Sequence, residues 1–396
     1  MGLPVAQPER FVGPLRLVEP LRRLAPTGLH AFDECRLRGA WSAARMPPLL
    51  PSSPAARLGT VVHRLLEEAG RGALSSNSLD GRWQELVAET EQAMTQSALE
   101  ARFVPLRETV PKYEVVRLRA EARAGELAQD LPDAGSRAAE AKASPYGYEL
   151  RVESADGLIA GRIDRAVPAP AGPVLQDYKS GAIFSIRQGE GQQEIRPEYA
   201  DQLRLYAALY YDSTGTWPSK LELVPLAGPP REIPLSTTAS LNLLDKARSL
   251  LGAVNDELER GVNDWYAVEA SLASPSPSAC RFCAYRPACA AYLSSIDQEG
   301  DPDWPADVVG AFGALTRLGN GRLILSITLS DGSASFVRNI TDRTVSAARL
   351  DTLEGGHPIA VFNLRRTKAA QAFEEGPLTM VYAGPQQDAE HLRRRA

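Results

Sequence analysis

Residues 158–179, LIAGRIDRAVPAPAGPVLQDYK, follow the point at which the sequence changes from helical to strand periodicity. The preceding residues 80–142 are rich in Ala, Glu and Arg and have helical periodicity. From residue 148 onward, polar and apolar residues alternate. Two turns interrupt this alternation, one at Asp156-Gly157 and one at residues 168–173. The pattern predicts a hairpin followed by a third strand.

Helices are predicted before and after these strands along the chain. In residues 58–69 the apolar side chains recur at helical spacing and give one buried stripe, made of Val62, Leu65, Leu66 and Ala69. A helix over residues 198–212, a strand over residues 221–225 and another helix over residues 240–260 follow. The order helix, three strands, helix, strand indicates a mixed α/β core.

Length and composition restrict the class of protein. A chain of 396 residues is too long for one ordinary core and predicts two domains. Hydrophobic residues make up 44% and charged residues 23%, which excludes fibrous and disordered classes. The net charge of -5 gives no global reason to expect a polyanion partner, so nucleic-acid binding would need a local basic groove. With no apolar run of membrane length and no secretory signal at the start, we expect a cytoplasmic protein without a membrane partner.

The predicted organisation has four parts. Residues 1–24 form an irregular leader, and residues 25–298 form the main domain, with residues 80–142 as a helical insertion. Residues 303–385 form a small β domain, and residues 386–396 are a basic tail. The size of the β domain is within the usual range of a small independent domain.

The small β domain has four predicted strands, at residues 322–329, 334–338, 358–364 and 378–382. They could form a barrel similar to an OB fold, which often binds single strands through aromatic stacking and a basic groove. The candidate contacts are Phe336, Arg338, Phe362, Arg365, Arg366 and Lys368. For the two phenylalanines a core position is favoured, and a role as protein adaptor is equally open.

Two aspartates and one lysine are the candidate catalytic group. Side chains alternate along a strand, so Asp177 and Lys179 project from the same face, and strand pairing can bring Asp164 beside them. Two adjacent carboxylates favour a cation between them, and Mg²⁺ or Mn²⁺ suits such hard oxygen ligands. The metal would activate water and polarise a phosphodiester oxygen, while Lys179 would stabilise the developing charge.

The alternative is a surface ion pair, worth at most about 1 kcal/mol. Lysine is scarce in this chain, which has six of them, so its placement two residues after an aspartate on an apolar strand favours a site. Two further pairs are spaced four residues apart on predicted helices, His63 with Glu67 and Gln202 with Tyr206. Taken alone, each of these pairs is more often a packing feature than a functional one.

Four motifs in their order along the chain resemble those of RecB-type nucleases in the PD-(D/E)XK superfamily. They are residues 59–67 (GTVVHRLLE), 161–164 (GRID), 177–181 (DYKSG) and 202–206 (QLRLY). The resemblance spans about residues 25–293. It implies a restriction-endonuclease-like mixed sheet flanked by helices.

The resemblance also implies roles for single residues. His63, Asp164 and Asp177 would be metal ligands, and the backbone carbonyl of Tyr178 would complete the metal's ligand shell. Lys179 would be the catalytic lysine beside the two aspartates. Residues matching the motif that lines the DNA channel are Gln202 and Tyr206, and further acidic candidates are Glu149 and Glu67.

The cysteines form a second candidate site. Cys280, Cys283 and Cys289 lie within ten positions, and Cys35 is the only other cysteine. Four thiolates can hold either Zn²⁺ or an iron-sulfur cluster, whereas the structural alternative is that buried cysteines only fill space. One cysteine before the core and three after it resemble the iron-sulfur staple of the AddB nuclease and of CRISPR-associated RecB-like nucleases. This resemblance implies a structural 4Fe-4S cluster, with zinc as the second candidate.

Together these resemblances imply a metal-dependent DNA nuclease. The preferred activity is exonucleolytic cleavage of single-stranded DNA or DNA ends in repair, recombination or defence. The chain has no Gly-x4-Gly-Lys-Ser/Thr phosphate loop, so a helicase or recombination partner would be encoded separately. The alternative is a catalytically inactive DNA-binding or scaffold module of a nuclease-helicase complex.

Overall fold

The computed structural model describes residues 11–129, 145–186, 193–261, 263–296, 301–369 and 371–383. The chain divides into two compact units. The mixed-sheet unit comprises Leu21–His30 and Ser53–Asn255, and the cysteine unit comprises Met1–Pro20, Ala31–Ser52 and Asp256–Ala396. Among the described residues, no helix combines the length and the apolar character that crossing a membrane requires.

This division differs from the predicted one, which separated a main domain from a β domain near residue 300. The segment around Cys35 and the segment around the other three cysteines belong to the same unit as the C-terminal strands. Hydrogen bonds explain the grouping: the N–H of Leu49 donates to the carbonyl of Ala284, and the Tyr382 hydroxyl bonds to the carbonyl of Leu49. The basic tail and the last part of the predicted helical insertion, residues 130–142, lie outside the described residues.

The mixed-sheet unit is built on a five-stranded sheet with the order β1-β2-β3-β6-β7. Its strands are β1 (Gly147–Glu153), β2 (Ala160–Val167), β3 (Val174–Lys179), β6 (Lys220–Pro225) and β7 (Arg231–Ile233). The pairs β1–β2, β2–β3 and β6–β7 are antiparallel, and β3–β6 is parallel. The predicted hairpin, third strand and later strand are therefore confirmed, and the sheet is mixed as expected. A small separate ribbon of β4 (Phe184–Ile186) and β5 (Gln193–Ile195) was not predicted.

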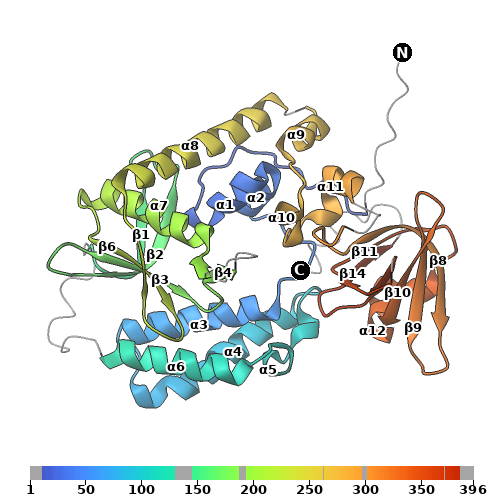
Figure 1. The fold of residues 1–396 in the computed structure, drawn as a ribbon, viewed down its shortest axis with the longest axis horizontal. Coiled ribbons are helices and arrows are strands. Elements are labelled where there is room, and N and C mark those ends of the chain that lie inside the picture. Colours follow the sequence, from blue (N-terminus) through green and yellow to red (C-terminus); the bar gives the residue numbers. More distant parts are fainter. Residues whose placement is uncertain are drawn as a thin grey trace. The chain divides into compact units, whose positions relative to one another are not determined.

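Helices cover both faces of this sheet. Figure 1 shows α3, α4 and α6 on one side and α7 and α8 on the other. Their bounds, with those of the short helix α5, are α3 (Pro54–Gly70), α4 (Leu79–Thr95), α5 (Leu106–Thr109), α6 (Tyr113–Gln129), α7 (Pro197–Thr214) and α8 (Thr237–Arg260). The helix α3 begins where Ser53 caps it and Pro54 occupies its first turn, and its predicted apolar stripe is fully buried. The fold class is the one expected from the sequence.

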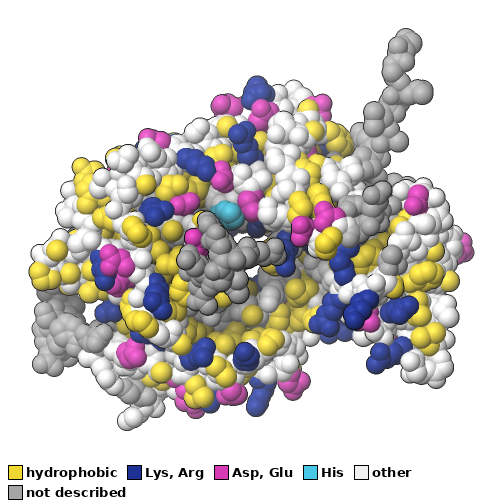
Figure 2. Space-filling model, viewed as in Figure 1, with side chains coloured by type: hydrophobic (Ala, Val, Ile, Leu, Met, Phe, Trp, Pro, Cys, Tyr) yellow, Lys and Arg dark blue, Asp and Glu magenta, His cyan; other side chains and the backbone are white. Residues whose placement is uncertain are grey.

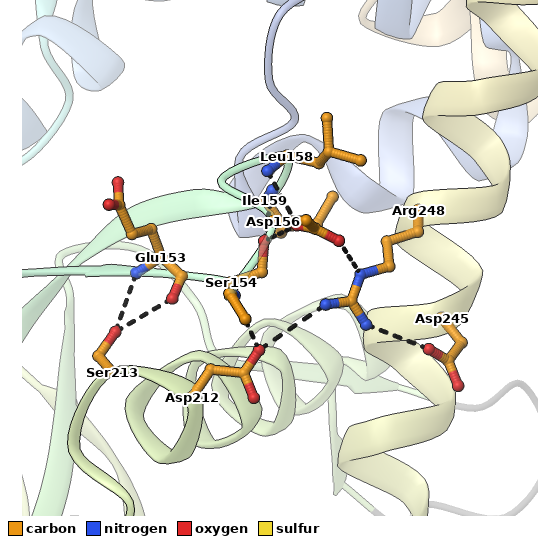
Figure 3. Close-up of polar contacts among 10 residues, drawn as sticks. Glu153, Ser154, Asp156, Leu158, Ile159, Asp212, Ser213, Asp245 and Arg248 are labelled. Carbon is orange, nitrogen blue, oxygen red and sulfur yellow. Dashed lines mark hydrogen bonds and ion pairs between the residues drawn. The ribbon is translucent and has the colours of Figure 1, made fainter.

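An arginine of α8 connects the turn between β1 and β2 with the helices α7 and α8. Arg248 contacts Asp156 in the turn between β1 and β2 at 2.6 Å, Asp212 near the end of α7 at 3.7 Å, and Asp245 one turn earlier at 3.3 Å (Figure 3). Asp156 also accepts a hydrogen bond from the N–H of Leu158, which closes the turn. The hairpin that presents Asp164 is thereby fixed at the end remote from that residue.

The cysteine unit combines short helices with a seven-stranded sheet. Its helices are α2 (Arg36–Ala43), α9 (Trp265–Leu272), α10 (Pro277–Arg281), α11 (Ala290–Ser295) and α12 (Asp342–Ala348), and α1 (Leu29–Glu34) precedes Cys35. The sheet has the order β12-β13-β10-β9-β8-β11-β14. Its strands are β8 (Val308–Arg317), β9 (Leu323–Thr328), β10 (Ala334–Ile340), β11 (Pro358–Phe362), β12 (Arg365–Arg366), β13 (Ala372–Glu374) and β14 (Met380–Ala383).

The four strands predicted in this sheet are present, but β8, β12 and β13 were missed. The sequence of β8 contains two glycines and a register shift between Phe312 and Ala314, so its alternation is broken. The expected core positions hold for Phe362, which is fully buried, and fail for Phe336, which is 42% exposed. The reason is register: Val337, the next residue on β10, takes the buried position instead.

Candidate active site

The two aspartates stand opposite each other on neighbouring strands. The β2–β3 register pairs Arg165 with Gln176, and continuing it by one residue places Asp164 opposite Asp177. The N–H of Tyr178 donates to Asp164 Oδ2 at 2.7 Å, which fixes that carboxylate against β3. Lys179 Nζ lies 2.6 Å from Asp177 Oδ2, as alternation along a strand requires. The aspartates and the lysine expected together are thus together.

The histidine of α3 joins this group. His63 Nδ1 lies 3.7 Å from Asp164 Oδ2. Burial lowers the pKa of His63, although the charge of Asp177 opposes this effect. A neutral imidazole is the form that binds metals. The helix can approach β3 because position 59 is glycine: a Cβ there would lie 2.9 Å from Ser180 Oγ.

Gln202 of α7 bridges the charged pair on β3. Its Nε2 donates to Asp177 Oδ1 at 2.9 Å, and its Oε1 accepts from Lys179 Nζ at 3.2 Å. Only 8% of Gln202 is exposed, so its amide is shielded from solvent and bonds to Asp177 and Lys179. The ring of Tyr199 also contacts the ammonium of Lys179, with Nζ 4.6 Å from the ring centroid. Tyr199 was not among the candidates, although its position three residues before Gln202 on one helix face could have suggested it.

Tyr206 lies one turn further along α7 and packs against the second motif. A Cβ at Gly161 would lie 2.9 Å from Tyr206 Cε1 and from Pro26 Cδ, so only glycine allows this approach. Burial raises the pKa of Tyr206, and the charges of Asp177 and Asp164 raise it further. The ring is therefore part of the wall behind the aspartates.

The carboxylates are in a costly environment for negative charge. Burial and the neighbouring charge of Asp177 raise the pKa of Asp164 to about 8. Burial also raises the pKa of Asp177, even though Lys179 favours its ionised form. Asp177 Oδ2 is buried and, among the described residues, forms no hydrogen bond with acceptable geometry, so its one close partner is the ammonium of Lys179. An additional positive charge would stabilise both carboxylates.

The two further acidic candidates also lie near the site. Burial and the charge of Glu67 raise the pKa of Glu149, and Glu149 in turn raises that of Asp164. Glu67 is paired with Arg71 at 2.6 Å, and Glu149 lies 3.9 Å from Arg162. Glu149 has a φ of +51°, which is rare for a residue with a side chain and could not be foreseen from alternation.

The four cysteines are buried and form no disulfide. Cys35 directly precedes α2 without capping it through its side chain, and its Sγ accepts the N–H of Ser274 at 3.5 Å, while Cys289 caps α11 and its Sγ accepts the N–H of Tyr292 at 3.4 Å. Burial raises the pKa of Cys280 to about 11, and that of Cys283 and Cys289 is raised for the same reason. A charge on Cys35 would raise the pKa of each of the other three thiols, so Cys35 lies near the other three cysteines.

Neither group of residues is a ready-made metal cage. In the part of the chain that the structure describes, no three His, Cys, Asp or Glu side chains are arranged so that they could hold a metal ion as they stand. At the aspartates, the ammonium of Lys179 neutralises part of the charge that a cation would neutralise.

Comparison with known proteins identifies the superfamily of the chain. A family model described as the PD-(D/E)XK nuclease superfamily matches residues 23–290. No curated protein and no solved structure matches the chain. The matched region contains the aspartates, Lys179, His63 and Gln202, together with all four cysteines. Because the match covers more than half of the chain, the protein belongs to the PD-(D/E)XK nuclease superfamily.

Proposed function

We propose that the protein is a metal-dependent DNA nuclease of the RecB-like type, which cleaves single-stranded DNA or DNA ends exonucleolytically. The observation that carries the proposal is the placement of Asp164 opposite Asp177, with Lys179 Nζ 2.6 Å from Asp177. Two buried carboxylates with raised pKa values and a lysine are a group that a divalent cation would complete. Repair, recombination or defence would each use this chemistry.

The donor atoms are of the kind that Mg²⁺ or Mn²⁺ binds, but the side chains would have to close around the ion, because the described side chains form no metal cage as they stand. Asp164, Asp177 and the neutral imidazole of His63 would hold the ion, together with the backbone carbonyl of Tyr178. The buried Asp177 Oδ2, which has no hydrogen bond among the described residues, supports the assignment. When bound, such an ion lowers the pKa of a coordinated water and polarises a phosphoryl oxygen.

The protein's own side chains supply the remaining requirements. Lys179 would stabilise the negative charge that develops on the attacked phosphate, since an ammonium is a compact point charge. The amide of Gln202 would keep Lys179 and Asp177 in position, because it is bonded to both. Tyr206 and Tyr199 would exclude water from the buried side of the pair, as their rings pack against it.

We also propose a structural 4Fe-4S cluster on Cys35, Cys280, Cys283 and Cys289. Four buried free thiols in one compact unit support it, as do the peptide N–H groups that point at Cys35 and Cys289. The cluster would join residues more than two hundred positions apart and so restrict the unfolded chain. Iron analysis and a brown colour would support it, and colourless protein that holds zinc would contradict it.

The test of the proposed function is cleavage of labelled single-stranded DNA by purified protein in Mg²⁺ or Mn²⁺. We expect wild-type protein to shorten the strand, and we expect Asp177→Ala and Lys179→Ala to lose the activity while staying folded. Asp351→Ala removes an exposed aspartate of the cysteine unit and should cleave as wild type does.

Two outcomes would contradict the proposal. If Asp177→Ala cleaved as fast as wild type, the activity would come from elsewhere, and a folded wild-type protein without cleavage would favour the inactive scaffold.

A circular single strand tests the exonucleolytic mode, because it has no end to degrade. A separately encoded helicase or recombination partner is the partner we would seek by copurification.

A further inference from the structure

The first strands of the C-terminal sheet are connected as in a small ligand-binding barrel. Strands β8, β9 and β10 form an antiparallel meander, and α12 links β10 to β11. β11 then pairs with the other edge of β8, and β13 pairs in parallel with β10. This meander followed by a helix resembles the first part of an OB fold, in which the face of the second and third strands contacts the ligand, but the sheet here has seven strands and is open, with β12 and β14 at its edges. Here those strands are β9 and β10.

We propose that the outer face of β9 and β10 binds an unpaired nucleic-acid strand through Phe336 and Arg338. The choice of DNA as that strand rests on the proposed nuclease function. The surface itself does not depend on that function, because it belongs to the cysteine unit and contains none of the catalytic candidates.

Strand register separates the two faces of this sheet. Leu325 pairs with Val337, and both are fully buried, so this row lies on the core side. Ser326 pairs with Phe336 in the neighbouring row, which therefore lies on the opposite, outer side. α12 packs on the core side, since Val345 belongs to the same apolar cluster as Leu325. The outer face is the side without this helix.

Phe336 is an exposed aromatic ring among small neighbours. It is 42% exposed, while its partners across the strands are Ser326 on β9 and Ala372 on β13. The next positions on β8 are equally small, because Ala314 pairs with Ser326 and follows Gly313. A flat ring with nothing bulky beside it offers a stacking platform, and stacking on a base is worth about 1–3 kcal/mol.

Basic side chains stand in the adjacent row of the same face. Arg338 pairs with Glu374 on β13, and Glu374 pairs with Arg365 on β12, so two arginines flank one glutamate. The Cα partner of Arg338 on β9 is Ile324, a partly buried side chain. Lys368 follows β12 in the loop that leads to β13. The ring of Phe336 lies one row away from these two arginines. A base could therefore stack on the ring while the neighbouring phosphates contact the guanidinium groups.

The charge distribution favours binding of the strand through a few local contacts. It does not favour binding through a broad, positively charged surface. Figure 2 shows Lys and Arg side chains interspersed with acidic ones over most of the face in view. With a net charge of -5, the chain cannot attract DNA by its overall field. The core of a protein–protein interface is enriched in aromatic residues and Met, whereas here one aromatic ring lies among Ser, Ala and Gly.

The test is the affinity of the full chain for a fluorescent oligothymidylate, measured by anisotropy in EDTA so that cleavage cannot occur. We expect Phe336→Ala to weaken binding about 10-fold or more, and Phe336→Trp to bind as tightly as wild type. Arg338→Gln should weaken binding and reduce its salt dependence. Arg343→Gln is the matched control, because it removes an exposed arginine from α12 and should bind as wild type.

The proposal is overturned if Phe336→Ala and Arg338→Gln both bind as wild type, or if a duplex of equal length binds as tightly as the single strand. It is also overturned if Arg343→Gln weakens binding as much as Arg338→Gln, since the effect would then be one of total charge. If Phe336→Ala fails to fold, Phe336→Trp and Arg338→Gln decide the matter.

Failure of this proposal can be told apart from failure of the nuclease proposal. Asp177→Ala should lose cleavage while its affinity for the oligothymidylate still depends on Phe336, and Phe336→Ala should lose affinity while any remaining cleavage still depends on Asp177. Wild-type protein that binds through Phe336 but cleaves nothing would overturn the nuclease alone. Cleavage that depends on Asp177, with binding indifferent to Phe336, would overturn this surface alone.

Discussion

Gln202 Nε2 donates a hydrogen bond to Asp177 Oδ1 at 2.9 Å from a neighbouring helix, at a place where both side chains are buried. The same amide accepts from Lys179 through its oxygen. A side chain described from sequence as part of a DNA channel is therefore positioned to orient the two groups at the centre of the site.

We expect Gln202→Ala to lower kcat about 10- to 100-fold with little change in KM, because supporting partners of this kind contribute on that scale. Gln202→Glu should lose as much, since a carboxylate would repel Asp177. Single-turnover cleavage of an oligonucleotide separates kcat from binding. A large rise in KM with unchanged kcat would show that Gln202 contacts DNA instead.

Stability in the absence of metal should depend on pH through Asp164. Its pKa is raised to about 8 in the folded protein, from an ordinary value of 3.8, so the folded state retains a proton that the unfolded state releases. Its contribution is therefore most favourable at low pH, and it is lost as the pH rises toward about 8. Chemical denaturation in EDTA at about pH 5 and about pH 8 measures this, and Asp164→Asn should flatten the change.

Divalent metal should reverse that trend, because it favours the ionised carboxylates. We expect Mg²⁺ to raise the midpoint of thermal unfolding more at about pH 8 than at about pH 6. Equal stabilisation at both values would argue against metal binding at Asp164 and Asp177.

The close approach at Gly161 gives a further prediction. A Cβ at this position would lie 2.9 Å from both Tyr206 and Pro26, so Gly161→Ala should cost about 1–3 kcal/mol of unfolding free energy. Gly181→Ala is the matched control, since nothing lies within 4 Å of a Cβ at that glycine. Urea denaturation of both variants measures the difference. Equal stabilities would show that the wall around Tyr206 yields without cost.

Alternation and helical spacing were sufficient to predict the elements that carry the candidate active site. Asp177 and Lys179 share a face because they are two residues apart, and Gln202 and Tyr206 because they are four apart. These relations are local, so the sequence contains them directly. The meeting of Asp164 with Asp177 depends on strand register, which the turn after β2 sets and which alternation leaves open.

Features that depend on distant contacts were not predictable. Tyr199 was missed because its role depends on contact with the ammonium of Lys179, which belongs to another element. The exposure of Phe336 depends on which face of β10 lies against the apolar core that α12 joins. The positive φ of Glu149 interrupts a strand whose residues otherwise alternate. Tertiary contacts determine the first two, and the backbone angle of Glu149 breaks the alternation on which the strand prediction relied.

Arg286 should be the most sensitive single residue of the cysteine unit. Only 2% of it is exposed, and its guanidinium donates to Asp307 Oδ2 at 2.7 Å, to the carbonyls of Cys280 and Cys283 at 2.8 and 3.0 Å, and to Asn363. One side chain thus joins the cysteine loop to the C-terminal sheet. We expect Arg286→Met to cost about 3–5 kcal/mol, because Asp307 would remain buried without its counter-charge.

Matched variants distinguish this buried pair from ordinary ion pairing. Arg260→Met removes an exposed arginine that pairs with Glu257 at 2.6 Å and should cost about 0–1 kcal/mol. Arg286→Met with Asp307→Leu should recover part of the loss, since no unpaired charge remains buried. If the double variant were as unstable as Arg286→Met, the hydrogen bonds to the two cysteine carbonyls would carry the stability, and the iron content of Arg286→Met should then fall as well.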